Sequence, residues 1–226
     1  VLWMFRQAII GFASDTPGAL RNIQLDFASL RNDRRSADAL ATLARGAAES
    51  LDYASSIEDA ELPELVGNDL FEDVERKIIS ALTQAIVERT MSAREVSETI
   101  RARQSSIWVD AYRELYVALA AASDLLSDLA TARFEIASFD DGLDRYRKHW
   151  FRIDQLYRQF HFAARTTECA GPLEALRVEV EKHYANRYLY ELGNAWQQQV
   201  DAVTEWQSLA LRPQMKFFTD HVGPII

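Results

Sequence analysis

The stretch WVDAYRELYVALAAASDLLSDLATARFEI, residues 108–136, places apolar side chains at alternating steps of four and three residues. The residues in phase are Trp108, Tyr112, Leu115, Leu119, Ala122, Leu126, Leu129 and Ile136. Because this spacing aligns side chains along one narrow seam of an α-helix, it predicts a long helix suited to left-handed coiled-coil packing.

The next stretch, FDDGLDRYRKHWFRIDQLYRQFHFAA at residues 139–164, keeps the same spacing. Its residues in phase are Phe139, Leu143, Tyr146, Trp150, Ile153, Tyr157, Phe160 and Ala164. A turn at residues 138–142 would fold the two helices into an antiparallel pair, each about 40 Å long at 1.5 Å per residue. Such a pair is typical of a scaffold, and Trp150 and Tyr157 are predicted to be core residues of its second helix.

The composition indicates an all-α protein, a helical bundle with long antiparallel coiled-coil-like helices. Glycine and proline number only 8 and 5 in 226 residues, which is typical of helices joined by short connections. Cys169 is the only cysteine, so no internal disulfide framework can form and a reducing compartment is expected. No apolar run approaches the ~20 residues of a membrane span, and no signal-peptide pattern occurs. We therefore expect a cytoplasmic protein with no membrane contact.

Three regions are expected along the chain. Residues 1–104 form a helical bundle subdomain, in which Ser92 and Glu95 supply a capping box for one helix. Residues 105–211 form the long antiparallel helices, and residues 212–226 form a short helix and a linker. The closing Gly-Pro-Ile-Ile is typical of a linker that leads into a buried strand. The chain is therefore predicted to be cut from a longer protein, just before a missing downstream domain.

Motifs for catalysis and metal binding do not occur in the sequence. No two histidines form a helical metal pair, and no Cys/His cluster, glycine-rich phosphate loop or nucleophile motif is present. The histidines are therefore interpreted as structural: His149, His161, His183 and His221. We expect no catalytic site, metal, cofactor or small-molecule substrate in this chain.

Charge is distributed unevenly within a net charge of −9. Residues 51–75 contain nine acidic residues and no Lys or Arg, whereas residues 145–165 contain six Lys or Arg and a single acid. Three interpretations of the basic segment remain open: a solvated or internally paired face, a docking face for an acidic protein, and a face that binds nucleic-acid phosphates. The cations that lie off the apolar seam and can reach a partner are Arg145, Lys148, Arg152 and Arg158.

Three strings in the second half resemble the PglZ proteins of BREX phage-defence systems. Residues 146–160, YRKHWFRIDQLYRQF, and residues 180–196, VEKHYANRYLYELGNAW, resemble that family's helical region. Residues 212–222, RPQMKFFTDHV, resemble the segment that leads into its alkaline-phosphatase-like domain. The part from Val1 to about residue 103 is consistent with the family but carries weaker signatures.

The resemblance implies a larger protein whose C-terminal domain belongs to the alkaline phosphatase superfamily and binds divalent metal. That domain's metal-ligand motifs have no counterpart here, so no catalytic residue carries over. We therefore predict a non-catalytic internal helical region that positions the downstream phosphatase-like domain and binds other BREX component proteins through Arg145, Lys148, Arg152 and Arg158. The alternative is a nucleic-acid-binding module that uses the basic face of residues 145–165.

Overall fold

The computed structural model describes residues 34–167 and 170–203. Every regular element in these residues is helical, with no strand among them, so the all-α prediction is confirmed. None of the described helices combines the length and the apolar character that crossing a bilayer requires. Cys169, His221 and the expected region 212–226 lie outside the described residues.

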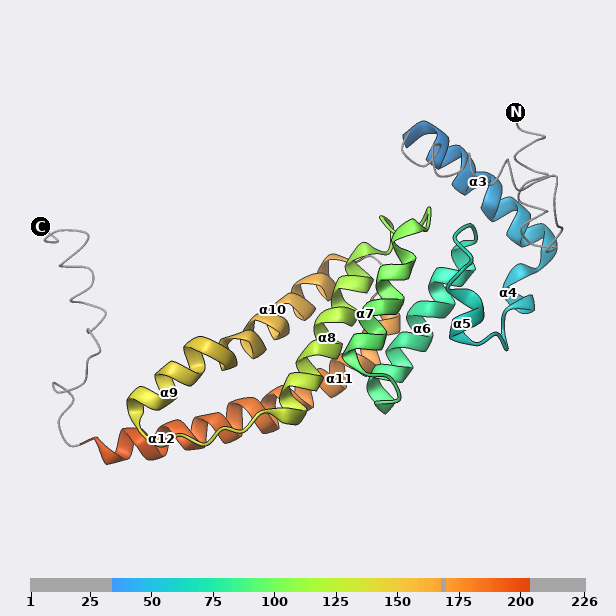
Figure 1. The fold of residues 1–226 in the computed structure, drawn as a ribbon. Coiled ribbons are helices and arrows are strands. Elements are labelled where there is room, and N and C mark those ends of the chain that lie inside the picture. The colour runs from blue at the N-terminus through green and yellow to red at the C-terminus, as the bar shows by residue number, and fades with distance from the viewer. Residues whose placement is uncertain (1–33, 168–169, 204–226) are drawn as a thin grey trace, which may run out of the picture.

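Short and medium helices make up the first half of the described chain (Figure 1). The elements are α3 (Arg34–Leu51), α4 (Tyr53–Ser56), α5 (Leu62–Leu65), α6 (Glu72–Glu88), α7 (Ala93–Ala102) and the 3-10 turn η1 (Arg103–Ser105). The predicted capping box at the start of α7 is confirmed. The Ser92 hydroxyl accepts from the Glu95 N–H at 3.3 Å, and the Glu95 carboxylate accepts from the Ser92 N–H at 2.7 Å.

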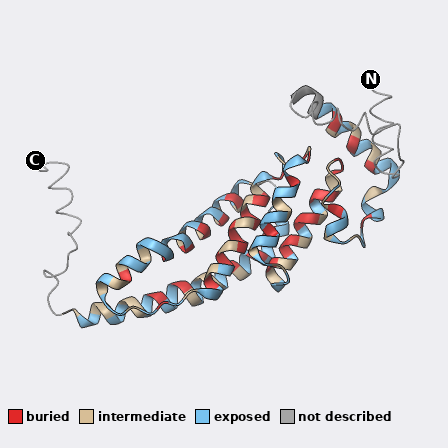
Figure 2. Ribbon diagram, viewed as in Figure 1, coloured by how far each residue is buried: buried red, intermediate tan, exposed pale blue. Residues whose placement is uncertain are grey.

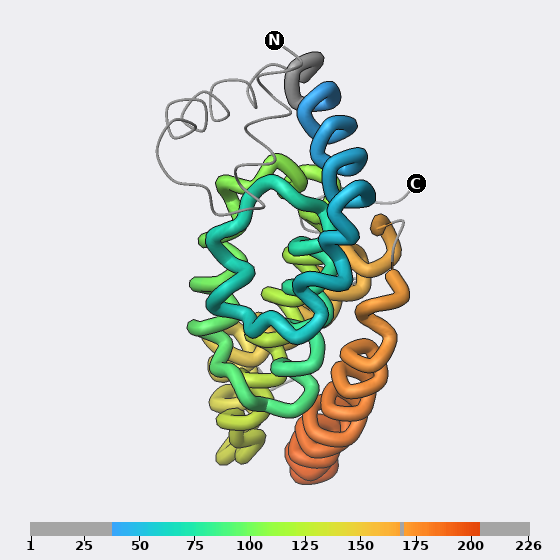
Figure 3. Tube along the Cα trace, turned by 90° about the vertical axis from the view of Figure 1, so that its right-hand side faces the viewer, coloured from blue at the N-terminus to red at the C-terminus, as the bar shows by residue number. Residues whose placement is uncertain are grey.

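Three long helical segments make up the second half, and each runs antiparallel to the one before it, so the first and the third run in the same direction (Figure 1). The first is α8 (Arg113–Thr131), and the second joins α9 (Phe139–Arg145), the π-helix η2 (Tyr146–Trp150) and α10 (Phe151–Thr166) without a break. The third joins η3 (Gly171–Leu173), α11 (Glu174–His183), the π-helix η4 (Tyr184–Leu192) and α12 (Gly193–Ala202). Viewed from the end that carries α3, these segments extend away from the viewer (Figure 3).

A continuous hydrophobic core runs from α3 to η4, with buried residues on the facing sides of the helices (Figure 2). Trp108, Leu119 and Leu129 of the first predicted seam are buried. In the second seam Trp150 is buried as predicted, whereas Tyr157 is only half-buried. Left-handed supercoiling of the pair and a domain division after residue 104 stay predictions.

The predicted turn at residues 138–142 is wrong, because these residues begin a helix. Ser138 is the N-cap of α9, and its hydroxyl accepts from the Asp141 N–H at 3.2 Å. Acidic residues in the first turn also favour a helix N-terminus. The chain instead reverses through an extended strap, residues 132–138, so α8 has only 19 residues and is shorter than the predicted helix of about 40 Å.

The strap runs along the third helical segment and is anchored there by polar and apolar contacts. Arg187 and Gln199 donate to the backbone carbonyls of residues 132 and 136, at 3.3 and 3.0 Å. Gly142, at the start of the second segment, permits a close approach, because an added Cβ would lie 2.8 Å from Ile136 Cγ2 and 2.9 Å from Trp196 Cη2. These contacts bring α9 and α12 together at the end far from α3.

Arg103 is the largest fully buried side chain of the first half. Its guanidinium donates to two carbonyls of the 66–68 loop, at 2.6 and 2.8 Å, to Asp69 Oδ1 at 3.0 Å and to Glu75 Oε1 at 2.6 Å. The Tyr116 hydroxyl donates to the other Glu75 oxygen. Part of the acidic segment 51–75 is therefore an internal anchor between α6, η1 and α8, since a buried charge is tolerated where it is paired and hydrogen-bonded.

Candidate functional site

The four predicted partner-binding cations lie along the second helical segment. Arg145 ends α9, Lys148 lies in η2, and Arg152 and Arg158 lie on α10. All four are exposed, because this segment turns its apolar seam toward α8 and toward the tyrosines of η4. Within the described residues, none of them pairs with a carboxylate of residues 51–75. The acidic and basic segments therefore do not neutralise each other through direct ion pairs.

Two of the cations pair with carboxylates one turn earlier on the same helix. Arg145 Nε lies 3.0 Å from Asp141 Oδ1, and Lys148 Nζ lies 2.7 Å from Asp144 Oδ2. Exposed pairs of this kind contribute only ~0–1 kcal/mol, because solvent screens them. Either cation can exchange its carboxylate for one on a partner at little cost.

Arg152 and Arg158 differ in how firmly they are held. Arg152 bridges to α8 with contacts of 2.8 Å to both Asp124 and Asp128. Arg158 donates only to the backbone carbonyl of Asp154, at 3.3 Å, and forms no ion pair within the described residues. Arg152 therefore joins two helices, whereas Arg158 keeps its charge available.

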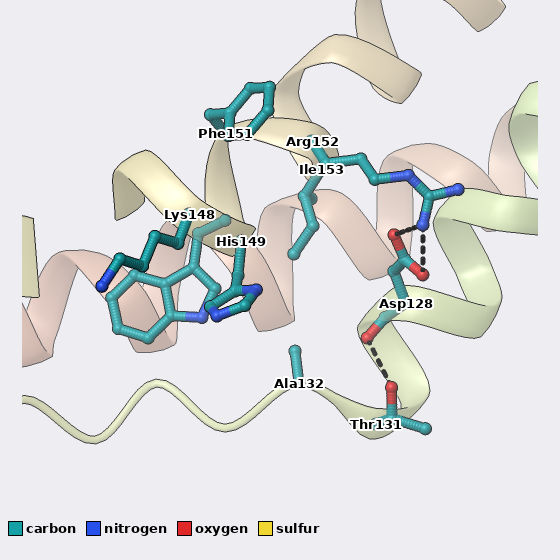
Figure 4. A pocket seen from close by; sticks show the side chains of 9 residues that line it. Asp128, Thr131, Ala132, Lys148, His149, Phe151, Arg152 and Ile153 are labelled. Atoms are coloured by element: carbon teal, nitrogen blue, oxygen red, sulfur yellow. Dashed lines mark hydrogen bonds and ion pairs between the residues drawn. The ribbon is translucent and has the colours of Figure 1, made fainter. Parts of the chain in front are cut away.

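A cavity of about 350 Å³ lies between α8 and the junction of η2 with α10 (Figure 4). Its lining consists of Asp128, Thr131, Ala132, Lys148, His149, Trp150, Phe151, Arg152 and Ile153. The Arg152–Asp128 pair closes one side, and burial raises the pKa of Asp128 although Arg152 opposes the shift. The Phe151 ring projects away from Ala132 and is 43% exposed. The cavity therefore opens beside a surface that is both basic and aromatic.

Asp154 is the acceptor for three tyrosine hydroxyls. The Tyr146 hydroxyl donates to Oδ2 at 3.0 Å, Tyr188 donates to Oδ2 at 2.9 Å, and Tyr184 donates to Oδ1 at 2.5 Å. Burial together with the Asp154 charge raises the pKa of Tyr184 and of Tyr188, and the bond to Asp154 is the main cause of the raised pKa of Tyr146. The tyrosines therefore stay protonated donors that join η2 and η4 to α10.

Both π-helices contribute to this cluster. Tyr146 lies in η2, whereas Tyr184 and Tyr188 lie in η4. A π-helix re-aims side chains relative to an α-helix and is frequent at functional sites. The Tyr184 ring also stacks on Tyr157, with 3.7 Å between ring centroids. Tyr184 and Tyr188 therefore form a helix–helix contact with polar edges, whereas Tyr190 is 67% exposed.

Among the described histidines, His149 is exposed and lines the cavity, whereas His161 and His183 contact other side chains. His161 Nε2 lies 3.2 Å from Glu181 Oε1, and His183 Nε2 lies 2.6 Å from Arg89 Nη2. Burial lowers the pKa of both imidazoles. In the part of the chain that the structure describes, no three His, Cys, Asp or Glu side chains gather in a group that could hold a metal ion.

The sequence predicts that the four cations can reach solvent, and it does not predict the groups that organise their surroundings. In the sequence Asp154 is only one negative charge in a basic segment, and nothing distinguishes Arg103 and Glu75 as buried residues. One signal for the Asp154 cluster is present, because Tyr184 and Tyr188 are four residues apart and so share one helix face. Nothing local indicates that they meet a carboxylate 30 residues earlier.

Two curated relatives match this chain. "Alkaline phosphatase-like protein PglZ" from Bacillus cereus (strain H3081.97) is 26% identical over 175 residues, which is 75% of this chain and 20% of that protein. "Alkaline phosphatase-like protein BrxZ" from Escherichia coli O9:H4 (strain HS) is 32% identical over 164 residues, 67% of this chain and 19% of that protein. The resemblance to PglZ proteins is thereby confirmed. The chain spans about a fifth of the length of these PglZ and BrxZ relatives. No family model and no solved structure matches it.

Proposed function

We propose that this chain is a helical scaffold section of a PglZ-like protein of a BREX phage-defence system. In this proposal it positions an alkaline-phosphatase-like domain that follows it and binds another BREX component. The similarity to the PglZ and BrxZ relatives supports the association with such a system. The observation that carries the docking role is the exposed basic face of the α9–η2–α10 segment, whose charges do not pair with the acidic segment 51–75.

The rigidity of the helical segments supports the positioning role. The second segment runs without a break from Phe139 to Thr166 and is therefore about 40 Å long at 1.5 Å per residue. Near its middle it is fixed to α8 through Arg152 and to η4 through Asp154, so it is held on two sides. A rigid helical segment that is held on two sides can keep an attached domain at a fixed distance and orientation relative to the rest of the chain.

Chemistry belongs, in this proposal, to the phosphatase-like domain and its divalent metal. The cations of the helical section serve assembly, because clustered charge raises the rate of encounter with an oppositely charged surface and loses this effect as salt increases. Mutations in this section should therefore change complex formation before they change phosphatase chemistry.

The test compares charge-reversed variants of the whole PglZ-like protein. Arg145→Glu combined with Arg158→Glu should reduce co-purification with the other BREX components, and the reduction should weaken as salt is raised. Arg94→Glu combined with Arg101→Glu, at exposed positions on α7, is the matched control and should leave association unchanged. Equal association of both variants, with equal helical content by circular dichroism, would refute the proposed docking role.

Nucleic-acid binding is the second candidate, supported by exposed Phe151 beside exposed cations. Arg and Lys can bind phosphates, and an aromatic ring can stack on an unpaired base. A labelled single-stranded oligonucleotide titrated with the chain at several salt concentrations separates the candidates. Nucleic-acid binding would be favoured over a protein partner by two results. The logarithm of the binding constant would fall linearly with the logarithm of the salt concentration, and the Arg145→Glu, Arg158→Glu variant would not bind.

A further inference from the structure

A second regular spacing, distinct from the apolar seam, runs along the outer side of α10. Its members follow one another at steps of four, three, four and three residues, and all are exposed. They are Phe151, Gln155, Arg158, Phe162 and Arg165, and we call this set the outer seam. The inner side of the same helix is buried through Ile153, Leu156 and Phe160.

The outer seam carries two large apolar side chains that none of the described elements covers. Phe151 is 43% exposed and Phe162 is 70% exposed. The two lie 11 residues apart, so three helical turns, about 16 Å, separate them along one face. Single exposed apolar residues are common and need no explanation, but two on one stripe at coiled-coil spacing match the way a helix presents itself to another helix.

The outer seam carries positive charge, and none of its five residues is acidic. Arg158 lies between the two phenylalanines, and Arg165 lies at the C-terminal end of the stripe. Neither forms an ion pair within the described residues. The one acid of residues 145–165, Asp154, accepts bonds from the three tyrosines at the contact with η2 and η4. The complementary surface therefore combines apolar side chains with negative charge.

From these observations we propose that the outer seam docks an acidic amphipathic helix of a different protein chain. This inference rests on the proposed function and names the chemistry of the partner. A helix with apolar residues at steps of three and four would cover Phe151 and Phe162, and its flanking Asp or Glu residues would face Arg158 and Arg165.

A second copy of this chain fits the outer seam less well. The unpaired carboxylates of the acidic segment lie on or beside α4 and α5, each of four residues, which is too short to lie along three turns of α10. Phosphates of a nucleic acid would pair with the arginines but would leave the stripe of phenylalanines without the regular apolar partner that its spacing matches. A protein helix satisfies both the charge and the spacing.

Site-specific photo-crosslinking of the whole protein in cells that contain the complete defence system tests this assignment. A benzophenone amino acid replaces Phe162, and the matched control places it at Leu51, an exposed apolar residue of α3. Mass spectrometry then reads the sequence of the attached segment. We expect a crosslink from position 162, and not from position 51, to another protein, within a segment that has apolar residues at steps of three and four and Asp or Glu beside them.

Charge reversal supplies the second arm. Arg158→Glu combined with Arg165→Glu should lower the crosslink yield by about tenfold, equal to about 1.4 kcal/mol, whereas Arg94→Glu combined with Arg101→Glu should not. Attachment to nucleic acid, to a second copy or to a non-acidic segment would overturn the inference, as would an absent crosslink. If the protein still co-purifies with its partners in that case, the outer seam is wrong and the proposed function stands. If the unmodified protein does not co-purify with any other BREX component, the proposed function itself is refuted.

Discussion

Removal of the Asp154 carboxylate is the most direct test of how the second and third helical segments are joined. Asp154→Ala leaves three hydroxyl donors without their shared acceptor. Tyr188 is 3% exposed and keeps one alternative, the Trp150 carbonyl at 3.2 Å. Tyr146 and Tyr184 are half-buried and can turn partly toward water.

The size of the effect follows from these environments. A hydrogen bond to a charged group contributes about 1.5–3 kcal/mol, and replacement by water or by the Trp150 carbonyl recovers part of it. We therefore expect Asp154→Ala to lower the free energy of unfolding by about 2–4 kcal/mol. At about 2–4 °C per kcal/mol for a chain of this size, Tm should fall by roughly 4–16 °C.

Urea denaturation of the full chain, followed by circular dichroism, measures this loss. Asp144→Ala is the control, because it removes an exposed carboxylate paired with Lys148 and should cost only ~0–1 kcal/mol. A double-mutant cycle with Tyr184→Phe isolates the pairwise coupling. Stability of Asp154→Ala within about 0.5 kcal/mol of the parent, together with no coupling to Tyr184, would show that the cluster does not join the helices.

Three further predictions concern single residues. Gly142→Ala should cost about 1–3 kcal/mol by overpacking in urea denaturation, whereas Gly193→Ala, with open space at its Cβ, should stabilise. Trp150→Ala should lower stability by about 3–5 kcal/mol, and an unchanged Tm would contradict its place in the core. Burial holds the pKa of His161 below its ordinary value, so its stabilising contribution is present above pH ~6.5 and is lost as the pH falls through the folded pKa. His161→Gln should flatten the decline of Tm between neutral and acidic pH, and an unaltered profile would exclude this histidine as its source.

Local sequence patterns predicted much of the fold because helices are specified over short distances. The four-and-three spacing identified Trp108, Leu119 and Trp150 as core, since one helical face must be buried. The Ser92–Glu95 capping box was predictable because both partners lie within a single turn. The turn at 138–142 was wrong for a related reason: serine followed by acids and glycine suits a turn and a helix N-terminus equally, and the competing strap has no periodic pattern.

Local sequence patterns do not predict polar pairs between residues far apart in the sequence. Arg103 meets Glu75 across 28 positions, and nothing near either residue distinguishes it from a solvated charge. The π-helices were also unpredictable, because a shift from i+4 to i+5 hydrogen bonds changes the spacing by one residue and depends on neighbouring segments. Composition describes how much charge a segment has, whereas tertiary contacts decide which charges face inward.

The Asp154 cluster and the outer seam are related, because on α10 the acidic residue makes the internal contacts and the arginines stay exposed. The carboxylate that could neutralise the neighbouring arginines lies at the contact with η2 and η4, where three tyrosines donate to it. Arg158 and Arg165 consequently keep their charge on the exposed side of α10, between and beside the exposed rings of Phe151 and Phe162. Salt bridges on an exposed helix stabilise little, so leaving these arginines unpaired costs the fold little. The same arrangement that fixes α10 inside the molecule thus leaves its outer side positively charged and able to bind a partner.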